Sequence, residues 1–394
     1  MKRLWLLLLA SAFLATGCSS LSGLAGMSTP AAPRCGDPRS MVLIVGAHRN
    51  APAPSLDPAL VCQVTAAIRA GLPVQIAVPS GQPLLITPRL VSVQGGTLAQ
   101  QNSPRVQQDV QRVQAAVAAA RPDSPGVDDL AALAVAADQA RSAGDPHAEL
   151  VLIDSGLDDR GALAFTAPGM VAATPAEVAR QLKASGNLPD FRGFTILLVG
   201  IGYTAPPQAP LPARWRSNVT QIWATVLRSA GAAVEIIPQP GQGPSVKTGQ
   251  PVRAVPVPPT QPVWNSRDPA FVFPDSGPVG FEPDTAAFRD PSAAYAALRR
   301  LAGYLAANSR AHIELTGTTA RWGSLAGCIA LAQQRANTVK AVLVQMGARP
   351  SQIVTRGLGW RFPGYENDQG PGGTLLPGPA EHNRSVIVTR LPDL

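Results

Sequence analysis

The stretch HIELTGTTARWGSLAGCIALAQQRA, residues 312–336, decides the fold of the second half of this 394-residue chain. Residues 313–316 alternate apolar and polar side chains, which is the period of a half-buried strand, and Gly317 ends that pattern. Apolar side chains then recur every three or four positions over residues 331–343, the spacing of an amphipathic helix. Arg335 therefore lies in the first turns of this helix, close to the preceding loop. A planar guanidinium beside small hydroxyl side chains is suited to holding a carboxylate.

Periodic segments on both sides of this stretch complete one α+β domain, which we place at residues 278–394. The elements are expected in the order β-α-β-α-β-β. They are strand 280–281, helix 293–307, strand 313–316, helix 328–346, strand 353–357 and strand 385–390.

Four groups of residues follow one another in this domain. The groups are Phe281 and Phe288; the loop Gly317, Thr318, Thr319, Ala320 and Gly323; the helix positions Cys328, Leu331, Ala332, Arg335, Ala336 and Val339; and Gly357, Gly359, Asn383, Arg384 and Val386. In these motifs and their order, residues 279–390 resemble the C-terminal peptidoglycan-associating domain of the OmpA family.

The resemblance implies a ligand and a site. In the OmpA family, a loop Asp and the helix Arg hold the amino and carboxylate groups of diaminopimelate on the peptidoglycan stem peptide. Arg335 is then expected to hold the carboxylate, and Thr318, Thr319 and the backbone around Gly317 to complete the pocket. The remaining candidates lie at the entry to the last strand, where they either contact the ligand or brace the loop: Asn383 and Arg384.

The binding loop departs from the family pattern at three positions. Ala320 stands where the family has its Asp, Cys328 where it has Asn, and Thr318 where it has His. The ammonium of the ligand loses its counter-charge, which weakens the expected binding. One hypothesis is that an acid from the excursion before the last strand replaces the missing Asp. Three residues are candidates: Glu366, Asp368 and Glu381.

The N-terminus is typical of a bacterial lipoprotein signal peptide over residues 1–17. A basic start precedes an apolar run, residues 4–14, that is too short for a mature membrane-spanning helix, and the run leads into the lipobox-like sequence ATGC. We predict cleavage before Cys18, a lipid on its thiol and a tether over residues 18–39. The lipid would insert in the outer face of the plasma membrane or, since Ser19 follows the cysteine, in an outer membrane.

Residues 40–240 predict a second domain, of the doubly wound α/β class. Continuous apolar runs of strand length alternate with amphipathic helices, as in a parallel sheet covered on both faces. The predicted strands are 41–46, 74–78, 84–93, 150–153, 194–200 and 233–237. Residues 241–277, rich in Pro and Gly and without periodicity, are expected to form a semi-rigid linker between the domains.

The α/β domain offers one candidate metal site, at the end of strand 150–153. The segment DSGLDD, residues 154–159, is similar to the D-x-S-x-S motif of von Willebrand factor A domains, although Gly156 and Asp158 stand where the serines belong. Its oxygens could hold a divalent cation or could form a plain turn, and we expect the turn, with no metal and no cofactor. His48 could pair with Asp154 as a general base.

Cysteine usage and charge agree with export. Once Cys18 is lipidated, Cys35 and Cys62 can form a disulfide in an oxidising compartment, which the sequence leaves open because their separation is not encoded locally. Cys328 is then unpaired. Lys and Arg number 33 and Asp and Glu 25, a formal net charge of +8, which favours anionic partners. No nucleic-acid motif is found, and export argues against DNA as a partner.

These observations predict a cell-envelope lipoprotein that anchors non-covalently to the peptidoglycan stem peptide and is held to a lipid bilayer by Cys18. The alternative is a protein-interaction scaffold whose C-terminal domain has lost peptidoglycan binding and whose α/β domain binds an envelope protein. A third hypothesis is a metal- or ligand-binding enzyme centred on Asp154 and His48. Enzyme activity is not expected, because no paired histidine ligands, nucleophile elbow or phosphate-binding loop is present.

Overall fold

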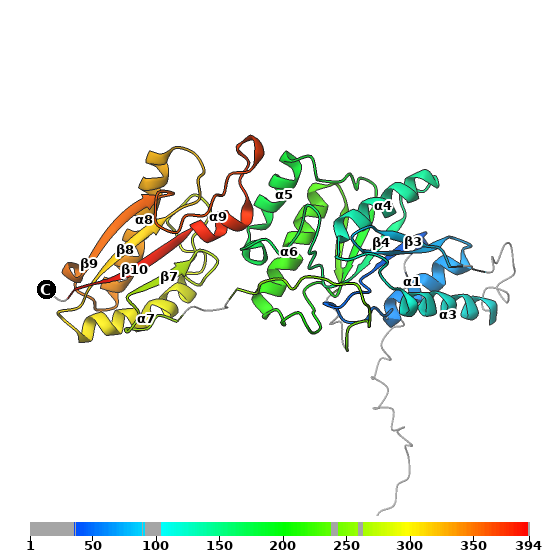
Figure 1. Cartoon of the computed structure of the whole chain (residues 1–394), viewed down its shortest axis with the longest axis horizontal. Coiled ribbons are helices and arrows are strands. Elements are labelled where there is room, and N and C mark those ends of the chain that lie inside the picture. Colours follow the sequence, from blue (N-terminus) through cyan, green and yellow to red (C-terminus); the bar gives the residue numbers. More distant parts are fainter. Residues whose placement is uncertain are drawn as a thin grey trace, which may run out of the picture.

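The computed structural model describes residues 35, 37–88, 90, 104–237, 243–258 and 263–392. The predicted signal peptide, the lipidation site Cys18 and most of the tether lie outside the described residues. Within the described ranges, no helix combines the length and apolar character needed to cross a bilayer. Two domains lie end to end along the long axis of the molecule (Figure 1).

The N-terminal domain is built on a six-stranded sheet in the order β3-β2-β1-β4-β5-β6. Every neighbouring pair is parallel except β2 and β3. The strands are β1 (Met41–Val45), β2 (Val74–Val78), β3 (Leu84–Ile86), β4 (Glu149–Ile153), β5 (Thr195–Val199) and β6 (Ala233–Ile237). The sequence MVLIV of β1 is buried at every position, as expected for a strand covered on both faces.

Helices cover both faces of this sheet, so the predicted doubly wound α/β class is confirmed. α1 (Pro58–Arg69) and α3 (Pro104–Ala119) pack on one face. α4 (Asp129–Ser142), α5 (Pro175–Ala184) and α6 (Ala213–Ser229) pack on the other. The sequence sets where α1 begins, because the Asp57 side chain accepts a 2.7 Å hydrogen bond from the Leu60 amide and Pro58 follows it.

The C-terminal domain has a four-stranded sheet in the order β7-β10-β8-β9. Its strands are β7 (Ala270–Pro274), β8 (His312–Thr318), β9 (Ile353–Gly359) and β10 (Ser385–Leu391). β8 and β9 are parallel, and β10 runs antiparallel to both β7 and β8. Its helices are α7 (Pro291–Ala307), α8 (Leu325–Gln345) and the short α9 (Pro377–Asn383), and it has 3₁₀ turns at Pro350–Gln352 and Pro371–Gly373. A further 3₁₀ turn, Met170–Ala172, lies before α5 in the α/β domain.

The first strand of this domain was predicted at the wrong place. Residues 280–281 form no strand; Phe281 makes an isolated bridge to Phe288, and their rings stack with centroids 5.1 Å apart. The strand is β7, whose Phe273 is buried while Val272 is 46% exposed. Only pairing with β10, more than a hundred residues later, makes this segment a strand, and so the local sequence gave little indication of it.

The predicted linker, residues 241–277, is also corrected. Besides containing β7, it packs onto the α/β domain, where Val246 and Val255 are buried. The Gln208 side chain donates to the Val255 carbonyl at 3.0 Å and accepts from its amide at 2.7 Å. Much of the segment is therefore part of the two domains. Its valines pack on apolar residues that are distant in sequence, and such packing leaves no periodic pattern in the segment itself.

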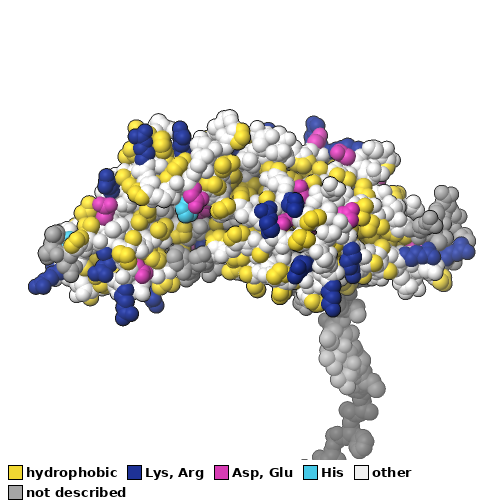
Figure 2. All heavy atoms as spheres, viewed as in Figure 1, with side chains coloured by type: hydrophobic (Ala, Val, Ile, Leu, Met, Phe, Trp, Pro, Cys, Tyr) yellow, Lys and Arg dark blue, Asp and Glu magenta, His cyan; other side chains and the backbone are white. Residues whose placement is uncertain are grey.

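Cys35 and Cys62 form a disulfide with Cα atoms 5.2 Å apart, which ties the entry of the α/β domain to α1. Cys328 is free and buried. Lys and Arg side chains are spread over both domains on the face shown in Figure 2 and do not gather into one patch.

Candidate functional site

A cavity of about 500 Å³ lies between the two domains and contains Arg335. The α/β domain lines it with residues of α5 and α6 and the turn before α5. The C-terminal domain contributes the turn after β7, the loop after β8, the first half of α8 and the region around α9. The contact between the domains is close: a Cβ on Gly378 of α9 would lie 2.1 Å from the Pro168 carbonyl oxygen. The cavity is therefore a feature of both domains together.

Arg335 is placed by α8, which begins after Ser324, whose hydroxyl accepts a 3.1 Å hydrogen bond from the Gly327 amide. Its side chain is 5% exposed and lines the cavity. Its guanidinium donates to the carbonyls of Thr285, at 2.9 Å, and Glu282, at 3.5 Å. Burial lowers the pKa of Arg335, but an arginine stays charged near neutral pH. A cation held by carbonyls rather than by a carboxylate can accept an anionic ligand.

The hydroxyl groups of the loop after β8 differ in role. Thr319 lines the cavity, and its hydroxyl is buried with no hydrogen-bond partner among the described residues. Thr318 is turned away from the cavity: its hydroxyl lies 2.8 Å from the Ser385 hydroxyl and accepts from the Ser385 amide at 3.1 Å. Thr318 thus holds β8 to β10, and its predicted place in the pocket is wrong because strand pairing fixes which way its side chain points.

Gly317 does not line the cavity either. A Cβ at this position would lie 2.0 Å from the Ala332 carbonyl oxygen, so only glycine allows α8 to approach β8 this closely. Its role is to bring Arg335 near the loop. The sequence analysis expected the backbone around Gly317 to complete the pocket. In the structure Gly317 instead allows close packing of α8 on β8.

Asn383 braces the loop before β10, which is one of the two roles left open for it. Its side chain is fully buried, donates to the Glu366 carbonyl at 2.7 Å and to Asp368 at 3.0 Å, and accepts from the Glu366 amide at 2.9 Å. Its hydrogen-bonding groups are used within this loop, and it does not line the cavity.

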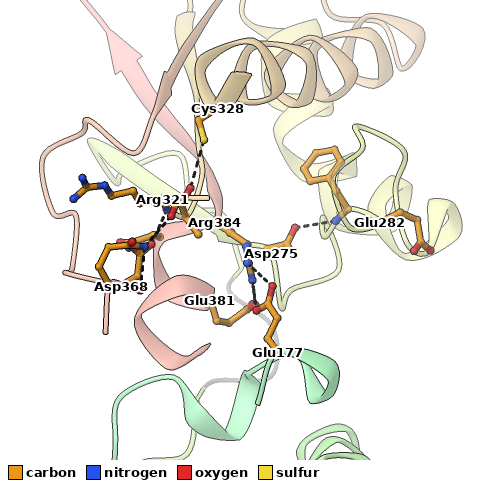
Figure 3. Close-up of polar contacts among 12 residues, drawn as sticks. Glu177, Asp275, Glu282, Arg321, Cys328, Asp368, Glu381 and Arg384 are labelled. Atoms are coloured by element: carbon orange, nitrogen blue, oxygen red, sulfur yellow. Dashed lines mark hydrogen bonds and ion pairs between the residues drawn. The ribbon is translucent and has the colours of Figure 1, made fainter. Parts of the chain in front are cut away.

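Arg384 lines the cavity but pairs with the other domain. Its two terminal nitrogens donate to the two carboxylate oxygens of Glu177 on α5, at 2.9 and 2.6 Å (Figure 3). Burial disfavours its charge, yet the hydrogen bonds and charge of Glu177 raise the pKa of Arg384 above its ordinary value. This guanidinium is not free for a ligand while the two domains remain in contact.

Of the three acids considered as replacements for the missing Asp, only Glu381 lines the cavity. One of its carboxyl oxygens is buried and has no hydrogen-bond partner among the residues that the structure describes. Burial, followed by the nearby charge of Asp275, raises the pKa of Glu381 to about 8. Asp368 instead accepts from the Arg321 amide at 2.8 Å and from the Tyr365 hydroxyl at 2.6 Å, and Glu366 lies 3.6 Å from His382. Figure 3 shows Glu381 beside Glu177 and Arg384.

Two substituted positions, Ala320 and Cys328, also line the cavity. The Cys328 thiol donates to the Trp322 carbonyl at 3.1 Å and approaches the Ala320 carbonyl at 3.8 Å. The thiol therefore supports the loop that carries Ala320. The sequence did not single out Glu177, Asp275 or Asp284 as site residues. They become acids of the cavity only when the two domains pack together.

The strand-end carboxylates of the α/β domain are engaged with their own domain. His48 Nε2 lies 2.8 Å from Asp154, and His48 Nδ1 accepts from the Asn50 amide at 3.2 Å, so both ring nitrogens are occupied. Asp158 accepts from the Asp129 amide at 3.0 Å, at the start of α4.

Burial raises the pKa of both Asp129 and Asp158, and within the described ranges no three His, Cys, Asp or Glu side chains are arranged to hold a metal ion. The cavity between the domains is thus the stronger candidate for a site.

Comparison with solved structures gives matches that each cover about a third of this chain or less. The peptidoglycan-associated lipoprotein from Burkholderia pseudomallei is 25% identical, over 28% of this chain and 86% of that one, with a TM-score of 0.23. The periplasmic domain of Helicobacter pylori MotB is 23% identical, over 32% and 76%, with a TM-score of 0.24. The OmpA-like domain of FopA1 from Francisella tularensis is 18% identical, over 32% and 73%, with a TM-score of 0.23.

No curated protein matches the chain. A family model does: the model of the OmpA family matches residues 280–372, which include α7, β8, α8 and β9. The match contains Arg335 and the loop that carries Thr319 and Ala320. The C-terminal domain of this chain is an OmpA-like domain of the OmpA family.

Proposed function

We propose that this protein binds the stem peptide of peptidoglycan non-covalently in the cavity beside Arg335, as a lipid-anchored protein of the cell envelope. The observation that carries the proposal is the buried guanidinium of Arg335, which lines a cavity of about 500 Å³ and makes its hydrogen bonds to carbonyl groups. The match of residues 280–372 to the OmpA family model supports the choice of ligand. The likeness of the first residues to a lipoprotein signal peptide supports the anchor.

In this proposal Arg335 and Thr319 bind a carboxylate of diaminopimelate. The hydroxyl of Thr319 has no other partner within the described part of the chain, so it can donate to a ligand oxygen. Glu381 takes the place of the missing Asp and faces the ligand ammonium. Because the pKa of Glu381 is about 8, its carboxyl group must lose a proton before it can pair with the ligand ammonium. Binding is therefore expected to be weaker near pH 7 than it would be with a carboxylate already ionised.

The test is cosedimentation of the soluble chain, from residue 19 onward, with insoluble peptidoglycan at low and at raised salt. Arg335→Ala should abolish binding that persists at raised salt, because a charge-assisted contact is lost inside a cavity. Arg299→Ala is the matched control: it removes one positive charge from an exposed position on α7 that does not line the cavity. Equal binding by wild type and Arg335→Ala would refute the proposal.

The alternative function is an envelope scaffold that has lost peptidoglycan binding. It is favoured by Ala320, a buried apolar residue at the position of the family's Asp. If wild type fails to sediment with peptidoglycan under all salt conditions, this alternative is preferred. The α/β domain would then be the part to use in a search for partners.

A further inference from the structure

The cavity contains positive charge from the α/β domain that the OmpA family motif does not account for. Arg180 of α5 and Arg214 of α6 both line it, opposite the loop residues of the C-terminal domain. Arg214 lies against its neighbour Trp215, with the guanidinium carbon 4.4 Å from the ring centroid. Within the described part of the chain, neither arginine makes a hydrogen bond or an ion pair with an acid. Both residues are exposed overall, although the guanidinium of Arg214 is partly buried where it lines the cavity.

The other charges of the cavity are largely paired. Arg384 is bound to Glu177, and Arg289 is bound to Asp275 at 2.9 Å. Glu381 is mostly protonated at neutral pH, given its pKa of about 8. Asp284 is exposed, also lines the cavity and acts on Arg335. What remains is an excess of positive charge, from Arg180, Arg214 and Arg335 against the single carboxylate of Asp284. Several unpaired cations around one cavity favour a ligand with more than one negative group.

Repulsion between arginines of the two domains agrees with an excess of positive charge in the cavity. Burial, followed by the Arg289 guanidinium of the other domain, lowers the pKa of Arg214, whereas Glu381 acts in the opposite direction. Arg384 likewise contributes to the lowered pKa of Arg335, after the larger effect of burial. An anion placed among these groups would relieve the repulsion between them.

Two residues that line this cavity have a buried polar atom with no hydrogen-bond partner in the described part of the chain, the Thr319 hydroxyl and one carboxyl oxygen of Glu381. Buried polar groups in folded proteins are nearly always hydrogen-bonded, so each marks a position where a ligand atom or a water belongs. They lie in the C-terminal half of the cavity, whereas Arg180 and Arg214 lie in the other half. The ligand would thus contact both domains.

We propose that the α/β domain completes the ligand site, with Arg180 and Arg214 binding a second carboxylate of the stem peptide whose first carboxylate is held by Arg335. This inference rests on the proposed function. It assigns a specificity to the full chain: the ligand must carry a free glutamate carboxylate, for Arg180 and Arg214, in addition to the diaminopimelate carboxylate held by Arg335. The pair Glu177–Arg384 holds the α/β domain in the position from which the two arginines can reach the ligand.

The test is a calorimetric titration of the soluble full chain with two probes. The first is a stem peptide that contains glutamate and diaminopimelate with free carboxylates, and the second is the same peptide with its glutamate carboxylate amidated. Wild type should bind the first about tenfold more tightly, the value of one charge-assisted contact at a partly exposed site. In the double variant Arg180→Gln/Arg214→Gln the two probes should bind equally.

Matched controls isolate the contact from general charge. Arg216→Gln removes a positive charge two positions along α6, where the guanidinium stacks on Tyr203 and does not line the cavity, and it should keep the tenfold preference. Arg335→Ala should weaken the binding of both probes. If Arg335→Ala weakens both while the double variant keeps the preference, this inference is overturned and the proposed function stands. If wild type binds neither probe, or Arg335→Ala binds both normally, both are overturned.

Discussion

Arg384, which precedes the last strand of the C-terminal domain, and Glu177, on α5 of the α/β domain, form a two-point ion pair across 207 positions of sequence. The donor–acceptor distances are 2.9 and 2.6 Å, and the side chains are 14% and 16% exposed. A parallel pair of hydrogen bonds fixes orientation as well as distance. This contact sets how the α/β domain sits over the cavity that contains Arg335.

Arg384→Ala is expected to loosen the contact between the domains. The change leaves the Glu177 carboxylate partly buried without its partner, a loss of about 1.5 to 3 kcal/mol for a hydrogen bond to a charged group. Small-angle scattering should show a larger radius of gyration than for wild type. Arg192→Ala, which breaks an exposed pair with Asp190, is the control and should change nothing. An unchanged radius of gyration for Arg384→Ala would show that other contacts are enough to hold the two domains together.

Glu381→Gln is expected to alter how stability depends on pH. The pKa of Glu381 is about 8 in the folded protein against an ordinary value of 4.5. Below pH 4.5 both states are protonated; between these values the unfolded chain releases a proton that the folded chain keeps. Stability contributed at low pH is therefore lost as pH rises to about 8, by at most about 1.4 kcal/mol per pH unit.

In the Gln variant this loss should be absent. Urea unfolding at several pH values should therefore show the free energy of unfolding of the variant increasing relative to that of wild type from pH 4.5 to about 8. Glu366→Gln, on a half-buried side chain outside the cavity, is the control for general loss of charge. Parallel pH profiles for wild type and Glu381→Gln would contradict the raised pKa.

Ala320→Asp tests the departure from the family motif directly. It places an acid where the family has one, and it is expected to tighten binding of a diaminopimelate-containing peptide by about tenfold through contact with the ammonium. The same change should lower thermal stability, because Ala320 is 3% exposed and a charge there is costly to bury. Ala320→Asn has the same shape without the charge; equal tightening by both variants would rule out a charge effect.

Cys18→Ser tests the predicted lipid anchor. In cells that process lipoproteins, wild type should be recovered with the membrane fraction and should carry the added mass of acyl chains on its first residue. The variant should lose both, because a serine hydroxyl does not replace the thiol in that modification. Cys328→Ser, at a buried cysteine far along the chain, is the control for loss of a thiol. A variant that stays in the membrane fraction would place the anchor elsewhere.

Local sequence patterns determined the elements that form the frame of both domains. The run MVLIV predicted β1, since a strand without polar positions must be covered on both faces. Asp57 and Pro58 predicted the start of α1. The helical period placed Arg335 on α8, although it lies at the middle of that helix and not in its first turns, because α8 begins at Leu325. These features depend on residues within one or two turns of each other, and so a single sequence contains them.

Other features were decided only by tertiary structure. β7 is a strand because β10 pairs with it, and Thr318 faces the sheet rather than the cavity because Ser385 lies opposite it. The meeting of Glu177 with Arg384, and the joining of Arg180 and Arg214 to the cavity of Arg335, depend on how two domains dock. No local period or cap encodes such contacts, since their energy is gained only when distant surfaces fit together.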